Sequence, residues 1–89
     1  MSVIHKYTLF GCPGHESSSL VEMPSTAKIL SCQFQDSAIR VWALHDEGLK
    51  VMRRFCCYGT GLDIPYRDRV HVATLQDRNG FVWHIFEEK

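Results

Sequence analysis

The chain has 89 residues, which is the size of one domain spanning residues 1–89. Its 45% hydrophobic content predicts a folded chain, and its 10 basic and 10 acidic side chains cancel to a formal net charge of zero. This balance argues against a nucleic-acid-binding domain with a clustered basic excess. No apolar run approaches the roughly 20 residues of a membrane span, and residues 1–6 lack the apolar stretch of a secretory signal. We therefore expect a cytoplasmic protein.

Apolar and polar residues alternate with a period of two in the first half of the chain, as in half-buried strands. We expect strands over Val3–Phe10, Leu20–Met23, Lys28–Gln35 and Ile39–His45. Gly11-Cys12-Pro13-Gly14 is a strong turn signal, and we expect Ser17–Ser19 to belong to the same loop. Asp36-Ser37 is predicted to turn the chain between the third and fourth strands.

The second half of the chain continues the strand pattern. We expect strands over Val51–Tyr58, Val70–Gln76 and Phe81–Glu87. Residues 46–57 also fit a helix capped by Asp46, but Gly48 in its first turn favours the strand. Residues 59–65 form a loop, and residues 77–80, ending in Asn-Gly, form a hairpin turn. The predicted fold is all-β, a compact antiparallel sheet of six to seven strands that forms a small sandwich or an open barrel.

A spacing of 41 residues relates two parts of the chain. Gln35-Asp36 and Val41-Trp42 recur as Gln76-Asp77 and Val82-Trp83. This 41-residue echo, a repeat of similar residues, indicates either a duplicated hairpin or the residue preferences that unrelated β-hairpins have in common. Both alternatives predict antiparallel pairing, because a short turn cannot join parallel strands.

The cysteines and histidines raise the question of a metal site. We expect the four cysteines to be reduced thiols, with Cys32 in the core. Cys12-x-x-His15 has the spacing of half a zinc knuckle, but no second pair completes four ligands. His71 and His84 are expected to face each other across the last hairpin as ordinary cross-strand residues. We therefore predict no metal and no cofactor.

Aromatic side chains are predicted to supply much of the core. They are Phe34, Trp42, Phe55, Phe81 and Trp83. The edges of a small sheet invite pairing with another chain, so we expect a homodimer.

An arginine-rich segment surrounds a glycine turn and is the main candidate for ligand binding. Glycines around a threonine expose backbone N–H groups that suit an anion, and arginine binds phosphate in a bidentate manner. The predicted ligand-binding residues are Arg53, Arg54, Tyr58, Gly59, Thr60, Gly61, Arg67 and Arg69. The tyrosines Tyr58 and Tyr66 offer rings for stacking. In the alternative interpretation, the glycines only shape the turn, and the arginines pair with Asp63 and Asp68.

Ordered motifs over nearly the whole chain resemble a family of small phage-encoded proteins of unknown function. They include Ile4-x-Lys6-Tyr7-x-Leu9, Ala27-Lys28-Ile29-Leu30-Ser31, Gly59-Thr60-Gly61-x-x-Ile64-Pro65 and Val82-Trp83-His84-x-Phe86. The chain departs from the family pattern at Gly11–Ser19 and at Cys56-Cys57. The resemblance implies a phage accessory protein in the cytoplasm of the infected host cell, and it transfers no catalytic residue.

Three functions follow as hypotheses. The leading one is a non-enzymatic protein that binds and inhibits a host protein, such as a component of antiviral defence. The second is a module that binds or sequesters a nucleotide or another small phosphate-bearing ligand at Gly59-Thr60-Gly61. The third, an enzyme that uses Cys56 or Cys57 as nucleophile, is the weakest, because no motif supplies the base and its orienting group. We therefore expect no enzymatic activity.

Overall fold

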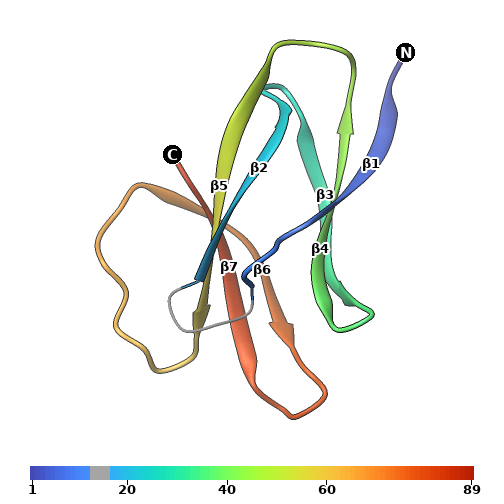
Figure 1. The fold of residues 1–89 in the computed structure, drawn as a ribbon. Helices are drawn as coiled ribbons and strands as arrows, with labels where there is room; N and C mark the ends of the chain where they lie inside the picture. The colour runs from blue at the N-terminus through green and yellow to red at the C-terminus, as the bar shows by residue number, and fades with distance from the viewer. Residues whose placement is uncertain (13–16) are drawn as a thin grey trace.

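The computed structural model describes residues 1–12 and 17–89, and Figure 1 shows them as two antiparallel sheets. The strands are β1 (Val3–Thr8), β2 (Ser17–Pro24), β3 (Lys28–Gln35), β4 (Ala38–His45), β5 (Lys50–Gly59), β6 (Arg69–Gln76) and β7 (Val82–Glu88). The described residues contain no helix. The all-β prediction is therefore confirmed, and the described residues form seven strands.

The two sheets form an open sandwich and not a closed barrel. The three-stranded sheet has the order β1-β4-β3, and the four-stranded sheet has the order β2-β5-β7-β6. The chain crosses from one sheet to the other after β1, after β2 and after β4. The smallest extent of the Cα trace is 17 Å, which fits two layers packed about 10 Å apart. β3 and β6 contact each other. β1 pairs only with β4, and β2 pairs only with β5, so each leaves one edge without a strand partner among the described residues.

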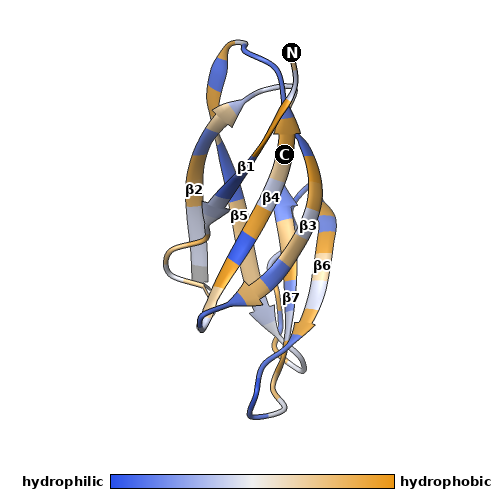
Figure 2. Cartoon of the chain, turned by 90° about the vertical axis from the view of Figure 1, so that its right-hand side faces the viewer, coloured by the Kyte–Doolittle hydropathy of each residue, from blue (hydrophilic) through white to orange (hydrophobic). Residues whose placement is uncertain are grey.

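The core lies between the sheets, because alternate residues of each strand point inward. In β4, Ile39, Val41 and Ala43 are fully buried, and they pack with Phe55 of β5 and Ile85 of β7. Figure 2 shows the corresponding alternation of hydrophobic and hydrophilic residues along the strands. Cys32 belongs to this core, as predicted.

One sequence-based boundary is corrected, and one open alternative is decided. Ser17–Ser19 is not a loop, because β2 begins at Ser17 and pairs with β5 along its whole length. This pairing supplies the backbone hydrogen bonds that serine by itself does not specify. Over residues 50–59 the strand prediction is confirmed and the helix alternative is wrong.

The aromatic prediction holds only in part. Phe55 is buried, and Phe34 and Trp83 pack against the core as half-buried side chains. Phe81 was expected in the core, but it precedes β7 in the hairpin turn and is 64% exposed. The side chain of Trp42 projects from the outer face, because its neighbours on β4 point inward.

The 41-residue echo corresponds to two antiparallel hairpins, β3–β4 and β6–β7. Their registers differ, however: Trp42 lies opposite Ser31, whereas Trp83 lies opposite Leu75. The two tryptophans therefore project from opposite faces of their sheets. A wider turn accounts for the difference, because Asp77 accepts hydrogen bonds from the backbone N–H groups of Asn79 and Phe81.

The metal-site candidates divide between described and undescribed residues. His15, and with it the predicted Cys12–His15 pair, lies outside the described residues. His71 and His84 do not face each other: Phe86 lies opposite His71, and Thr74 lies opposite His84. In the described part of the chain, no group of three or more histidine, cysteine or acidic side chains could bind a metal ion. Within the same residues, no helix has the length and hydrophobicity to cross a membrane.

Candidate functional site

Two consecutive arginines of β5 point to opposite faces of the four-stranded sheet. Arg53 lies on the inner face with Phe55, and Arg54 lies on the outer face with Cys56. β7 pairs with β5 and places Glu87 on the inner face and Glu88 on the outer face. Each arginine therefore has its own carboxylate, and the sequence-predicted arginine cluster is divided between two environments.

The inner pair, Arg53 and Glu87, is largely buried and held by several short hydrogen bonds. Arg53 donates from Nε and Nη2 to the two carboxylate oxygens of Glu87 over 2.6 and 2.8 Å, and from Nη1 to the backbone oxygen of Ala27 over 2.7 Å. The side chains of Arg53 and Glu87 are 14% and 10% exposed. The hydrogen bond and charge of Glu87 raise the pKa of Arg53, against the effect of burial. This pair connects β5, β7 and the β2–β3 turn, and it leaves Arg53 unsuited to a ligand.

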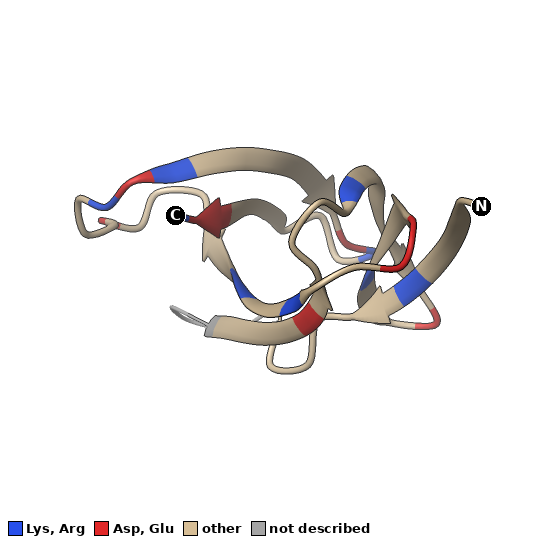
Figure 3. Ribbon diagram, turned by 90° about the horizontal axis from the view of Figure 1, so that it is seen from above, with Lys and Arg blue, Asp and Glu red and all other residues tan. Residues whose placement is uncertain are grey.

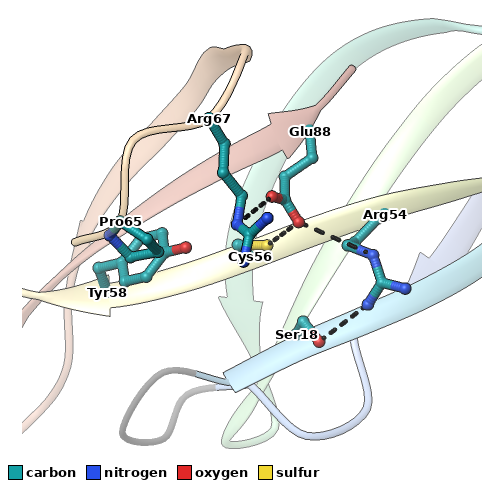
Figure 4. A pocket seen from close by; sticks show the side chains of 7 residues that line it. All are labelled: Ser18, Arg54, Cys56, Tyr58, Pro65, Arg67 and Glu88. Atoms are coloured by element: carbon teal, nitrogen blue, oxygen red, sulfur yellow. Dashed lines mark hydrogen bonds and ion pairs between the residues drawn. The ribbon is translucent and has the colours of Figure 1, made fainter.

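The outer pair belongs to an open hollow of about 370 Å³, which we call the arginine pocket (Figure 4). Its lining residues are Ser18, Arg54, Cys56, Tyr58, Pro65, Arg67 and Glu88. The two arginines reach it from different elements, Arg54 from β5 and Arg67 from the loop that precedes β6. Both approach Glu88, with Nε–carboxylate distances of 3.7 Å from Arg54 and 3.2 Å from Arg67. The side chains of Arg54 and Arg67 are 45% and 58% exposed, so their guanidinium groups are accessible.

A third arginine lies beside the pocket. The guanidinium carbon of Arg69 lies 5.4 Å from the ring centroid of Tyr58 and 5.7 Å from that of Phe86. Arg69 also donates to the backbone oxygen of Pro65. Its Nε and Nη1 atoms are buried and have no hydrogen-bond partner among the described residues. The ring of Tyr58 is thus covered by Arg69, so Tyr58 forms a wall of the pocket and is not a free stacking surface.

Positive charge is in local excess at this site. The guanidinium groups of Arg54 and Arg67 approach the single carboxylate of Glu88, and that of Arg69 lies against the nearby ring of Tyr58. Elsewhere basic and acidic segments are interspersed over both sheets, as Figure 3 shows. The observed ion pairs are with Glu87 and Glu88, and among the described residues none joins these arginines to Asp63 or Asp68. The zero net charge of the chain therefore conceals a basic site.

The glycine turn lies apart from the arginine pocket. Gly59 and Thr60 line a separate, more apolar hollow with Phe81 and Trp83. The N–H of Thr60 donates to the backbone oxygen of Val82 over 3.2 Å. The Thr60 hydroxyl shares a 2.7 Å hydrogen bond with Nε2 of His84. These contacts join the turn to β7.

Gly61 has a φ of +90°, which favours glycine for conformational reasons alone. The following N–H, that of Leu62, donates to the backbone oxygen of Gly59 over 3.4 Å. The turn's N–H groups at Thr60 and Leu62 are thus already used within the fold. These contacts stabilise the turn. The N–H groups of Thr60 and Leu62 are therefore not free to bind an anion, which the predicted ligand site at this turn would require of them.

Cys56 also faces the arginine pocket, and its thiol donates to a carboxylate oxygen of Glu88 over 3.1 Å. Burial, together with the hydrogen bond and the charge of Glu88, raises the pKa of Cys56 to about 11. A thiol in this environment stays protonated near neutral pH and is a poor nucleophile.

Of the eight predicted ligand-binding residues, the structure places three in the pocket lining and one directly beside it. The three are Arg54, Tyr58 and Arg67, and the fourth is Arg69. Sequence reasoning missed Glu88, Cys56 and Ser18 as members of the site. The period-two pattern of β5 and β7 could have separated Arg53 from Arg54, but the register that sets Glu88 opposite Arg54 had no sequence signal.

Comparison with known proteins gives a family without an assigned activity. The model of a domain of unknown function, DUF7352, matches residues 1–89. No curated protein and no solved structure matches the chain. Because the match covers all 89 residues of the sequence, the chain belongs to the DUF7352 family.

Proposed function

We propose that this domain is a non-enzymatic binding protein that captures a phosphate-bearing ligand at the arginine pocket. The observation that supports the proposal most strongly is the approach of Arg54 and Arg67, from separate elements, to one point in an open hollow. Both side chains present Nε to Glu88, and both are about half exposed. Their guanidinium groups are therefore available to an anion from solvent.

Arginine suits this task because its planar guanidinium binds phosphate oxygens through two parallel hydrogen bonds. A hollow of about 370 Å³ has room for a phosphate and part of the group attached to it. The protonated thiol of Cys56 and the single carboxylate of Glu88 provide no activated nucleophile. Capture without turnover is the function that this set of side chains supports best.

Isothermal titration with nucleoside monophosphates tests the proposal. We expect Arg54→Ala and Arg67→Ala each to weaken binding about tenfold or more, since a hydrogen bond to a charged group contributes roughly 1.5–3 kcal/mol. Arg78→Ala is the matched control, because Arg78 is exposed in the β6–β7 turn and is not part of the pocket. Absence of any heat with the wild-type chain, or an equal loss in Arg78→Ala, contradicts the proposal.

A second candidate function is the binding and inhibition of a host protein by a phage-encoded chain in the infected cell. The specific observation in its favour is β1, an edge strand on which Val3 and Ile4 are exposed. Exposed edges of this kind pair with strands of other chains, including a second copy of the same chain.

The two candidates differ in the surface that they use. An inhibitor that binds through β1 should keep its partner in Arg54→Ala and lose it in Ile4→Lys, which places a charge on the exposed edge strand. Retention of the partner in Ile4→Lys would argue against β1 as the contact. Light scattering of the purified chain distinguishes a homodimer from a monomer, and a dimer through β1 should likewise dissociate in Ile4→Lys.

A further inference from the structure

The arginine pocket already contains an anion, the side chain of Glu88. Its carboxylate lies between two guanidinium groups, 3.2 Å from Nε of Arg67 and 3.7 Å from Nε of Arg54. The thiol of Cys56 donates to the same carboxylate from below, as Figure 4 shows. Glu88 therefore occupies the position that a negatively charged group of a ligand would take.

We propose that the Glu88 carboxylate is an internal counterion that the phosphate of a bound ligand displaces. Glu88 then sets the affinity of the arginine pocket by competing with the ligand for Arg54 and Arg67. It excludes anions that bind these two arginines no more tightly than its own carboxylate does. This inference rests on the proposed function, since it concerns the same pocket.

The geometry of the outer pair fits a contact that can be exchanged. Arg53 binds both oxygens of Glu87 through two short hydrogen bonds, whereas Arg54 and Arg67 approach Glu88 as looser ion pairs, with Nε–carboxylate distances of 3.7 and 3.2 Å. The side chains of Arg54 and Arg67 are 45% and 58% exposed, so water competes for both guanidinium groups. The Glu88 side chain is 16% exposed, and its release into solvent gives up these two ion pairs and the hydrogen bond from Cys56, which the bound phosphate must offset.

The need to replace a carboxylate restricts the class of ligand. Exchange of one carboxylate for another gains nothing in charge, whereas a phosphate monoester carries a charge of about −1.5 to −2 near pH 7 and offers three acceptor oxygens. The guanidinium groups of Arg54 and Arg67 can use that additional charge. The pocket therefore fits a terminal phosphate better than a carboxylate.

The test compares two small probes with the same ring, phenyl phosphate and benzoate, on the full chain and on Glu88→Gln. Glutamine keeps the size of the side chain and an oxygen that can accept from the arginine Nε groups, but it removes the competing charge. We expect the wild-type chain to bind phenyl phosphate and to bind benzoate at least tenfold more weakly. We expect Glu88→Gln to bind phenyl phosphate about fivefold more tightly or better, a gain of the order of one exposed ion pair.

A direct observation accompanies the affinities. The carboxyl carbon of Glu88 should shift during titration of the wild-type chain with phenyl phosphate, because it leaves its arginine partners. Glu88→Asp provides a second variant, since its shorter side chain weakens the contact with both arginines while keeping the charge. It should bind phenyl phosphate with an affinity between those of the wild type and Glu88→Gln.

The outcomes separate the two proposals. Tighter binding by Glu88→Gln, with a shift of the Glu88 carboxyl carbon in the wild type, supports the internal counterion. Binding by the wild type that is unchanged or weaker in Glu88→Gln overturns the counterion and leaves the proposed function standing. Failure of both proteins to bind phenyl phosphate or a nucleoside monophosphate overturns the proposed function itself.

Discussion

The two arginine–glutamate pairs of β5 and β7 have the same chemical groups and opposite surroundings. Arg53 and Glu87 lie on the inner face, where the guanidinium also binds the backbone of the β2–β3 turn. Arg54 and Glu88 lie on the outer face, where a second arginine approaches the same carboxylate. A shift of one residue along a strand thus separates an ion pair that supports the fold from one that we propose a ligand can replace.

The largest expected difference between the two faces is in stability. Arg53→Ala leaves the Glu87 carboxylate and the Ala27 backbone oxygen without their donor, so the free energy of unfolding should fall by about 3 kcal/mol or more. Arg54→Ala removes an exposed partner and should change it by less than about 1 kcal/mol. Urea denaturation of both variants measures the difference, and equal losses would show that the inner pair is no more important to the fold than the outer one.

The next effect concerns the thiol beside Glu88. With a pKa of about 11, Cys56 should hold about a hundredfold less thiolate near pH 8 than a thiol at the ordinary value of 9.0. We expect slow alkylation of Cys56 by iodoacetamide, which mass spectrometry of the cysteine peptides can follow as the pH rises towards 11. Glu88→Gln should accelerate the reaction, because it removes the negative charge of Glu88, which is one cause of the raised pKa.

The control for this experiment is Cys32, whose pKa burial raises to about 12. Its alkylation should not respond to Glu88→Gln, because Cys32 lies in the core between the sheets. The raised pKa values of Cys32 and Cys56 also make the stability of the fold depend on pH. Both thiols ionise more easily in the unfolded chain, so the free energy of unfolding is retained below pH 9.0 and should fall as the pH rises through the folded-state pKa values. Equal acceleration of both cysteines would indicate general loosening of the fold and not a local effect of Glu88.

The smallest expected effect is the coupling within the outer pair. A double-mutant cycle of Arg54→Ala and Glu88→Gln, measured by urea denaturation, should give a coupling energy of roughly 0.2–1 kcal/mol that decreases with added salt. The corresponding cycle of Arg53→Ala and Glu87→Gln should give several times that value and little salt dependence. A strong, salt-independent coupling between Arg54 and Glu88 would mean that Glu88 is held too firmly to be displaced.

The strands themselves could be predicted from the sequence to a large extent. Alternation over Lys28–Gln35 matched β3 at both ends, because a strand buried on one face leaves a clear pattern of two. The serine run at the start of β2 could not be predicted, since serine favours turns and only its pairing with β5 makes it a strand. Phe81 was misplaced for a similar reason, because the wider turn at Asp77 moves it out of β7.

The candidate site could be predicted only in its composition. The sequence indicated that arginines and a tyrosine near residues 53–69 would meet, but nearness in sequence suggested that the glycine turn would lie among them. The pairing of β5 with β7 decides otherwise: it sets Glu88 opposite Arg54 and sets Gly59 opposite Trp83, at the other end of the shared ladder. Contacts that depend on strand register between residues 24 to 34 positions apart leave no local signal in a single sequence.

The most direct test of the account is a titration of the full chain with phenyl phosphate, observed at the Nε–Hε resonances of its arginines. Arg54 and Arg67 should shift together and reach saturation with one dissociation constant, while Arg53, fixed to Glu87 and Ala27, should not move. Shifts that do not saturate, that include Arg53 equally, or that occur at the Gly59–Gly61 turn and spare Arg54 and Arg67 would contradict it.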